Sequence, residues 1–185
     1  LSAWRGGLLD RLLMAAADAL LAIPRLILLV VCGALWRPGA VTLVAGLVAT
    51  GWMAVARLVR AEVLGIRTRP FVEGAAALGA RPARILWRHV LPNALGSAIV
   101  AMTLGVGGAI LLESGLSFLG LGVQPPQPSW GNMIADGRDA IVIAPWVALA
   151  PGLALIVTVV ASTFLGDALR DRLAGDSVAT LRDRA

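Results

Sequence analysis

The stretch from Phe71 to Asn93, FVEGAAALGARPARILWRHVLPN, decides how the rest of the chain is organised. It lies between two long apolar segments, yet it carries several charges. Pro70 suits the first turn of a helix, where its missing N–H leaves no bond unmade. Gly79 follows good helix formers and can end that helix in a left-handed conformation. Pro82 can begin a second helix that runs to about Leu91. The stretch therefore predicts two short helices separated at Gly79.

The charge pattern of this stretch allows two interpretations. Arg81, Arg84 and Arg88 are spaced by three and four residues, so they share one face of the second helix. The stretch can be a solvated loop whose arginines rest on lipid headgroups. It can also be a contact surface, because the small residues 74–77 make a narrow helix that another protein could approach closely. Long loops in compact domains are more often functional than not.

Composition points to a lipid environment. The chain is 58% hydrophobic and 15% charged, and its mean hydropathy is +0.84. Soluble domains are nearer half apolar and a quarter charged, so we expect an integral membrane protein. All 16 basic residues are arginine. Without lysine, the chain can supply neither a phosphate-loop lysine nor a Schiff base.

Metal and nucleic-acid functions are not favoured. Cys32 and His89 are the only cysteine and histidine, so the chain can form no internal disulfide and no ordinary zinc site. The net charge of +5 would suit nucleic acid, but in so apolar a chain the arginines are expected to set membrane topology. We predict no metal site, no nucleic-acid partner, and the lipid bilayer as the surroundings.

Four apolar segments predict four membrane spans, at about 19–36, 41–59, 94–112 and 146–165. Arg25 is expected near the cytoplasmic side of the first span, where it can snorkel. Glu113 is expected to close the third span. Small residues recur along the third span at every fourth position, which lets another helix come near. These predicted helix-packing or pathway residues are Ser97, Ala101, Gly105 and Ala109.

The segment 114–145 is predicted not to span the membrane, because Pro125, Pro126 and Pro128 forbid a continuous helix there. Arginine predicts its side. With alternating spans, only Arg37 and Arg138 clearly fall on the same side as this segment. The other face of the membrane receives Arg5, Arg11, Arg57, Arg60, Arg67, Arg69, Arg81, Arg84, Arg88, Arg170, Arg172, Arg182 and Arg184. The positive-inside rule makes that face cytoplasmic and the segment 114–145 extracytoplasmic.

With this topology, the residues resemble a family. The pattern Glu73-Gly74-Ala75, then Gly79, then Leu91-Pro92 resembles the EAA loop of type I ABC importer permeases. A second group of segments resembles the dipeptide, oligopeptide and nickel branch of that family. These segments are LVRAEVL (58–64), ALGA (77–80), RHVLPNAL (88–95), LSFLGLGVQPPQPSWGNM (116–133), APW (144–146) and LGDALRD (165–171). Gly74 departs from the family's alanine, and His89 stands where the general signature has isoleucine.

The resemblance implies an all-α integral membrane protein with the type I ABC importer transmembrane fold. Residues 1–185 would form one transmembrane domain, lacking the first two of six spans, with the coupling loop 70–92 in the cytoplasm. The residues it implies for ATPase coupling are Glu73, Gly74, Ala75, Gly79, Arg84, Arg88, His89, Leu91 and Pro92. The extracytoplasmic motif comprises Ser117, Phe118, Leu119, Gly120, Pro125, Pro126, Trp130 and Gly131.

The same resemblance implies a division of labour. The chain would form half of a translocation pathway for peptides or a related small solute in the bacterial inner membrane, with its C-terminus in the cytoplasm. Its partners would be a second, paralogous permease subunit, two ATPase subunits and an extracytoplasmic binding protein. ATP and Mg would bind the ATPase subunits, and the chain itself would hold no cofactor and no catalytic residue.

Two other classes fit less well. A proton-coupled secondary carrier would place ionisable residues near the membrane midplane, whereas Glu113 and Asp167 are predicted at span ends. A hydrolytic enzyme would need His89 near Ser114, Ser117, Asp136 or Asp139. His89 is predicted on the opposite side of the membrane from those residues, so no catalytic triad can form.

Overall fold

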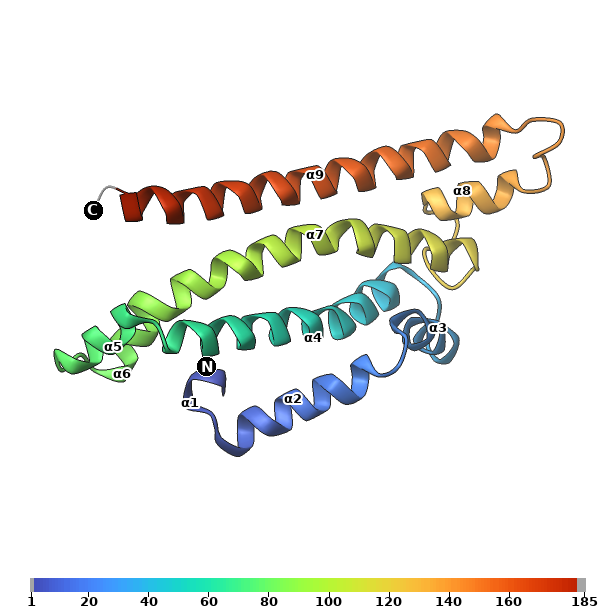
Figure 1. The fold of residues 1–185 in the computed structure, drawn as a ribbon. Coiled ribbons are helices and arrows are strands. Elements are labelled where there is room, and N and C mark those ends of the chain that lie inside the picture. Colours follow the sequence, from blue (N-terminus) through green and yellow to red (C-terminus); the bar gives the residue numbers. More distant parts are fainter. Residues whose placement is uncertain (1, 183–185) are drawn as a thin grey trace. The chain divides into compact units, whose positions relative to one another are not determined.

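The computed structural model describes the backbone of residues 2–182 and the side chains of residues 2–172. This part of the chain consists of helices joined by turns, without a strand (Figure 1). The predicted all-helical class is confirmed. The elements are α1 (Ser2–Arg5), α2 (Gly7–Leu21), α3 (Arg25–Leu35), α4 (Ala40–Arg67), α5 (Pro70–Ala77), α6 (Pro82–Ile85), the π-helical turn η1 (Leu86–Val90), α7 (Leu91–Phe118), α8 (Trp130–Gly137) and α9 (Trp146–Arg182).

Three helical runs in the described part of the chain are long and apolar enough to cross a membrane. They are Ala40–Arg67, Pro82–Phe118 and Trp146–Arg172. The predicted spans 41–59, 94–112 and 146–165 lie inside these runs. Helices α2 and α3 pass the same test only when taken together across their break. The positions at which lipid begins and ends on each helix remain predictions.

The predicted first span, 19–36, is not one continuous helix. Helix α2 ends at Leu21 and α3 begins at Arg25, with Pro24 at its N-cap. Proline has no N–H for the helical ladder and disfavours helical geometry in the residue before it, so the helix breaks here. Helix α3 has 11 residues. At 1.5 Å per residue it is about 16 Å long, roughly half the hydrocarbon thickness.

The Arg25 side chain makes contacts that the sequence did not predict, because it hydrogen-bonds to the neighbouring helix α4; its position near the cytoplasmic side stays a prediction. Its Nε donates to Thr50 Oγ1 at 2.9 Å, and its Nη2 donates to the Leu47 carbonyl at 3.0 Å. Thr50 lies near the middle of the predicted span 41–59. The hydroxyl and carbonyl of α4 thus accept two of the hydrogen bonds that this guanidinium can donate.

One predicted helix end is wrong, because the helical run does not stop at Leu91 but continues through Pro92 to Phe118. The π-helical turn η1 lies just before Pro92. Its wider hydrogen-bonding pattern lets the helix continue although Pro92 has no backbone N–H to donate. The Asn93 side-chain amide also donates to the His89 carbonyl at 2.6 Å. At Glu113 no residue breaks the helix, which ends five residues later at Phe118. The end of the third span at Glu113 remains a prediction.

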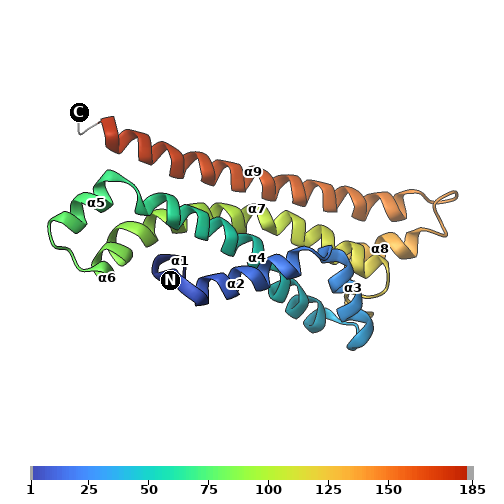
Figure 2. The same ribbon diagram turned by 60° about the horizontal axis from the view of Figure 1, so that its bottom comes forward.

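The described chain divides into two compact units. Unit 1 comprises 1–22, 52–102 and 166–185, and unit 2 comprises 23–51 and 103–165. The core of unit 1 joins α1, the C-terminal part of α4, the helices α5 and α6, and the start of the following run. Both ribbon views show α5 and α6 just beyond the end of α4 at Arg67 (Figures 1 and 2). The buried residues of this unit 1 core are Ala3, Val63, Ile66, Val72, Ile85, Leu86, Val90 and Ala94.

The core of unit 2 is formed by Leu29 of α3, Leu43 of α4 and Leu116 of α7. Helix α8 packs closely against the end of α7 at Gly131. A Cβ at Gly131 would overlap the Ser114 carbonyl and would come within 2.9 Å of the Ser117 Cβ. Glycine is therefore required here for close packing, although its backbone angles are ordinary.

We predict that Gly131→Ala destabilises the protein by about 1–3 kcal/mol, because the added methyl forces α8 away from α7. The matched control is Gly115→Ala, where an added Cβ meets nothing within 4 Å. Thermal unfolding of the purified protein measures both. The packing argument is wrong if the two variants unfold at the same temperature.

Candidate functional site

Local sequence signals determine where the helix in the first half of the Phe71–Asn93 stretch begins and ends. Pro70 is the first residue of α5, and Arg69 is its extended N-cap. Gly79 has φ 82°, which confirms the predicted left-handed end of this helix. The Ala80 N–H donates to the Ala75 carbonyl at 3.1 Å, and the Gly79 N–H donates to Ala76 at 3.0 Å. This pair of bonds is the Schellman motif, which turns the chain sharply after α5.

The second half of the stretch is held by burial. Val90 is 0% exposed, Ile85 3% and Leu86 7%. They pack together with Val72 of α5 against Val63 and Ile66 of α4. The α5–η1 region is therefore seated on the end of α4, and its buried face is apolar.

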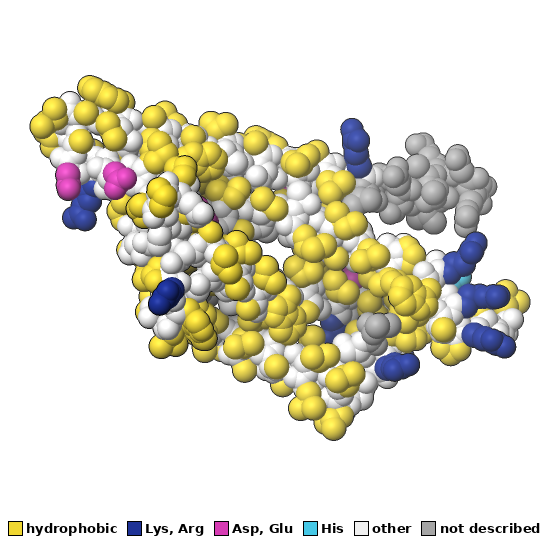
Figure 3. Space-filling view, turned by 180° about the vertical axis from the view of Figure 1, so that it is seen from behind, with side chains coloured by type: hydrophobic (Ala, Val, Ile, Leu, Met, Phe, Trp, Pro, Cys, Tyr) yellow, Lys and Arg dark blue, Asp and Glu magenta, His cyan; other side chains and the backbone are white. Residues whose placement is uncertain are grey.

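The opposite face is exposed and mixed in character. Leu78, which precedes the Gly79 turn, is 91% exposed, and Trp87 is 62% exposed. Arginine side chains gather around the same end of unit 1 (Figure 3). We call this face the α5–η1 surface, defined by the exposed residues Phe71, Glu73, Gly74, Ala76, Ala77, Leu78, Gly79, Arg81, Arg84, Trp87 and Arg88.

The nine residues predicted for coupling do not all lie on this surface. Glu73, Gly74, Gly79, Arg84 and Arg88 are exposed there, and Pro92 is exposed at the start of α7. Ala75 instead packs against the core of unit 1. His89 and Leu91 are partly buried, and the His89 ring lies 6.3 Å from the Phe71 ring. These three residues are less exposed than the other six, and the coupling role of all nine stays a prediction.

Two features of unit 1 were missed from the sequence. One is Leu78, whose apolar side chain resembles a core residue until the turn at Gly79 places it outside. The other is a polar clamp from the first helices to α4. The Asp10 carboxylate is only 6% exposed, and Arg60 contacts it at 2.9 Å through both Nε and Nη2. The Arg67 guanidinium lies 5.3 Å from the Trp4 ring centroid. Sequence offered no signal for these pairings, because their members are far apart along the chain.

The predicted extracytoplasmic motif forms the turn from α7 to α8 in unit 2. Ser117 and Gly131 are buried there, whereas Phe118, Leu119, Pro125 and Pro126 are exposed. Gly120 has φ 74° and ends α7 as Gly79 ends α5. The Ser117 hydroxyl oxygen accepts a hydrogen bond from the Val123 N–H at 3.0 Å. The motif thus has a clear structural role in folding this turn.

The small-residue stripe remains a prediction. Ser97, Ala101 and Ala109 are partly buried, and a Cβ at Gly105 would meet nothing within 4 Å. Helix α7 comes close to α9 at Gly107 instead, where a Cβ would lie 3.4 Å from Val159 and 3.8 Å from Thr163 of α9. Sequence reasoning missed Gly107 because it followed every fourth residue from Ser97.

Comparison with known proteins identifies the family. Residues 1–175 match the binding-protein-dependent transport system inner membrane components. The chain belongs to this family.

Three relatives of this inner membrane component show its branch. It is 39% identical over 173 residues to the oligopeptide transport system permease protein OppC of Bacillus subtilis, covering 94% of this chain and 57% of the relative. It is 45% identical over 162 residues to the probable peptide ABC transporter permease protein y4tQ of Sinorhizobium fredii, covering 88% and 56%. It is 39% identical over 173 residues to the glutathione transport system permease protein GsiD of Pectobacterium atrosepticum, covering 94% and 58%. The chain therefore spans little more than half the length of these relatives.

We predict that Ile66→Ala makes the α5–η1 region more mobile, because it removes part of the apolar surface of α4 against which this region packs. Ile66 is 1% exposed, and such a truncation costs about 2–5 kcal/mol in a packed core. Leu64→Ala is the matched control, since Leu64 is 37% exposed on the same helix. Trypsin cleavage after Arg84 and Arg88 should become faster in Ile66→Ala alone. Equal cleavage of the two variants would contradict this account of the seat.

Proposed function

We propose that the chain is part of a permease subunit of an ATP-driven importer, forming half of a pathway for peptides or a related small solute. The observation that carries the proposal is the family match across residues 1–175, combined with an exposed α5–η1 surface on a rigid seat. The relatives named above are permeases for oligopeptides, peptides and glutathione, which supports a peptide-like solute.

In this proposal the α5–η1 surface docks in a cleft of a separate ATPase subunit. Leu78 supplies an exposed apolar contact, and Glu73, Arg84 and Arg88 supply charged contacts around it. A rigid attachment matters because movement in the ATPase must pass through these helices to the spans. The buried side chains of Ile85 and Val90 and the Schellman turn at Gly79 provide that rigidity.

The remaining parts of the transporter are also proposed. A second permease subunit completes the pathway, two ATPase subunits bind ATP and Mg, and an extracytoplasmic binding protein delivers the solute. The arginine asymmetry supports a bacterial inner-membrane location with the α5–η1 surface and the C-terminus in the cytoplasm. Arg184 takes part in that count but lies outside the described residues.

The rival proposal is a proton-coupled secondary carrier. Uptake that continues after the proton gradient is collapsed, but stops after ATP is depleted, supports the importer. The opposite pattern supports the carrier.

We predict that Gly79→Val leaves the amount of inserted permease near normal while uptake and co-purification of the ATPase collapse. At φ 82° a side chain costs roughly 1 kcal/mol or more, and a β-branched one costs most. That cost is too small to unfold the domain but large enough to redirect Leu78. Gly65→Ala is the control, because it adds a methyl within α4, outside the α5–η1 surface, where a Cβ meets nothing within 4 Å.

Leu78→Glu tests the same surface without altering the turn. It should also release the ATPase, whereas Leu119→Glu, at a 57% exposed leucine in unit 2, should not. Normal uptake by both Gly79→Val and Leu78→Glu would contradict the proposal that the α5–η1 surface couples the permease to the ATPase.

We predict that the segment 114–145 faces out of the cell. In a Cys32→Ser background, a cysteine introduced by Gln127→Cys should react with an impermeant thiol reagent in intact cells. Ala76→Cys, at an exposed position of α5, should react only after the membrane is permeabilised. The reverse labelling pattern would overturn the topology.

A further inference from the structure

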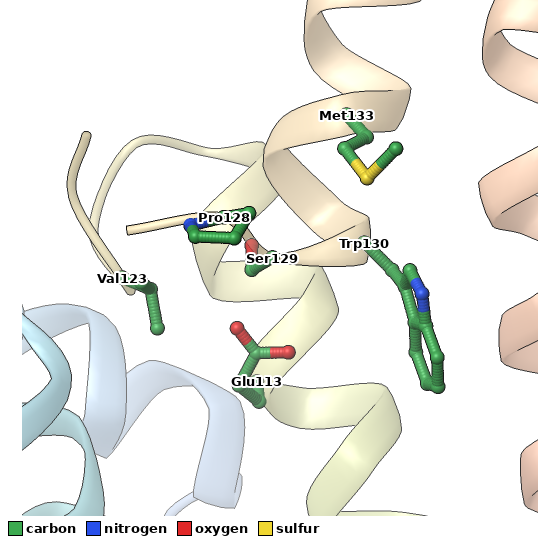
Figure 4. Close-up of a pocket in the computed structure, with 6 residues that line it drawn as sticks. All are labelled: Glu113, Val123, Pro128, Ser129, Trp130 and Met133. Carbon is green, nitrogen blue, oxygen red and sulfur yellow. The ribbon is translucent and has the colours of Figure 1, made fainter. Parts of the chain in front are cut away.

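An open pocket lies beside the turn from α7 to α8, entirely within unit 2 (Figure 4). Its volume is about 500 Å³, and it is lined by Glu113, Val123, Pro128, Ser129, Trp130 and Met133. Pockets for small organic molecules have roughly 300–1,000 Å³. The pocket is therefore larger than an inorganic ion needs and fits part of a small solute.

Glu113 is held in place by neighbouring hydroxyl groups. Ser117 Oγ donates to Glu113 Oε1 at 2.7 Å, and Ser114 Oγ donates to Oε2 at 3.2 Å. Both serines are buried, Ser117 at 2% exposure and Ser114 at 4%. Each carboxylate oxygen has two lone pairs, so both oxygens keep acceptor capacity for another donor.

The charge of Glu113 has no protein counter-ion among the described residues. The ion pairs found there join Arg57 to Asp18 and Arg60 to Asp10, both in unit 1. No basic side chain lines the pocket, whose other walls are mainly apolar. A carboxylate in such surroundings is stabilised when a cation enters and pairs with it.

The other walls suit an organic cation in particular. In Figure 4 the Glu113 carboxylate points toward Ser129, and the Trp130 side chain lies on one side of it. Tryptophan is the best aromatic partner for a cation. The Met133 thioether adds a polarisable apolar wall, which suits the carbon atoms next to an ammonium group.

We propose that this pocket binds the protonated amine of a small organic solute, such as the amino terminus of a peptide. Glu113 pairs with the ammonium group, and Trp130 and Met133 contact the carbon atoms beside it. The proposal rests on the proposed importer function, since it assigns the pocket to the transported solute. No cationic side chain lines the pocket, so none competes with the ammonium group of the solute for Glu113.

A purely structural role for Glu113 predicts different behaviour. Through Ser117, the carboxylate helps to hold the Val123 N–H and the turn that follows α7. Glu113→Gln keeps an oxygen that accepts from Ser117 but removes the negative charge. Ser117→Ala keeps the charge but removes the link to Val123. The two variants thus separate charge from turn stability.

The test uses the assembled transporter containing the full-length permease, in lipid nanodiscs without its binding protein and without ATP. The probes are alanylalanine amide, a cation without a carboxylate, and its neutral N-acetyl derivative, with binding measured by calorimetry. The cation should bind, and the N-acetyl derivative should not. Glu113→Gln should weaken binding roughly tenfold or more, the usual loss for a charge-assisted hydrogen bond. Asp139→Asn, an exposed acid after α8, is the matched control and should bind as the wild type does.

Thermal unfolding completes the test. Glu113→Gln should unfold near the wild-type temperature, whereas Ser117→Ala should unfold earlier. The proposal is overturned if the N-acetyl derivative binds equally well, if Glu113→Gln binds the cation normally, or if no binding of the cation is detected. If any of these results is found while the transporter still shows ATP-driven uptake, the amine-binding proposal is wrong but the importer function stands. If binding depends on Glu113 but no ATP-driven uptake is measured, the amine-binding proposal stands and the importer function is wrong.

Discussion

The burial of one face of the α5–η1 region against α4 is the constraint on which unit 1 depends. Val63 and Ile66 form the receiving side, and Val90, with 0% exposure, is the most deeply buried of the side chains placed on it. Because this face is apolar and fully covered, the opposite face has to carry the charges and the exposed Leu78. The division into a buried and an exposed face is thus set by hydrophobic burial, while the direction of the tip is set by the Gly79 turn.

The same local device ends helices in both units. Gly79 follows Leu78, and Gly120 follows Leu119; both glycines have positive φ values, 82° and 74°. In each case the residue after the glycine donates to the carbonyl five positions earlier, Ala80 to Ala75 and Leu121 to Leu116. The leucine before each glycine points outward, at 91% and 57% exposure. A Leu-Gly pair at a helix end therefore predicts an exposed leucine, which hydrophobicity alone would have assigned to the core.

The sequence predicted what is determined locally and failed where distant or backbone effects decide. Pro70 and Gly79 marked the ends of α5 correctly because capping signals act within one turn. Pro92 misled the prediction because a π-helical turn, which has no sequence signature, lets the helix continue. Pro24 was underestimated because the apolar residues around it suggested one long span. The partners of Asp10, Arg25 and Gly107 depended on which helices meet, and no pattern along a single chain carries that information.

The chain treats its charged groups in three physical ways, and the difference indicates which of them can respond to a ligand. Asp10 and Arg60 neutralise each other at 2.9 Å with the carboxylate buried, so their pairing fastens α2 to α4. Asp18 and Arg57 face each other at 3.4 Å while more than half exposed, and water screens such a pair to little net stability.

Arg25 and Glu113 belong to the third kind, because neutral dipoles solvate them. Arg25 donates to a hydroxyl and a carbonyl, and Glu113 accepts from two hydroxyls. Dipoles hold these side chains in place but leave their charge uncancelled. A fixed, uncancelled charge attracts an opposite charge without first having to break an ion pair. For that reason Arg25 and Glu113, which neutral dipoles hold in place, are better suited to bind a charged solute than the exposed arginines of unit 2, Arg37 and Arg138.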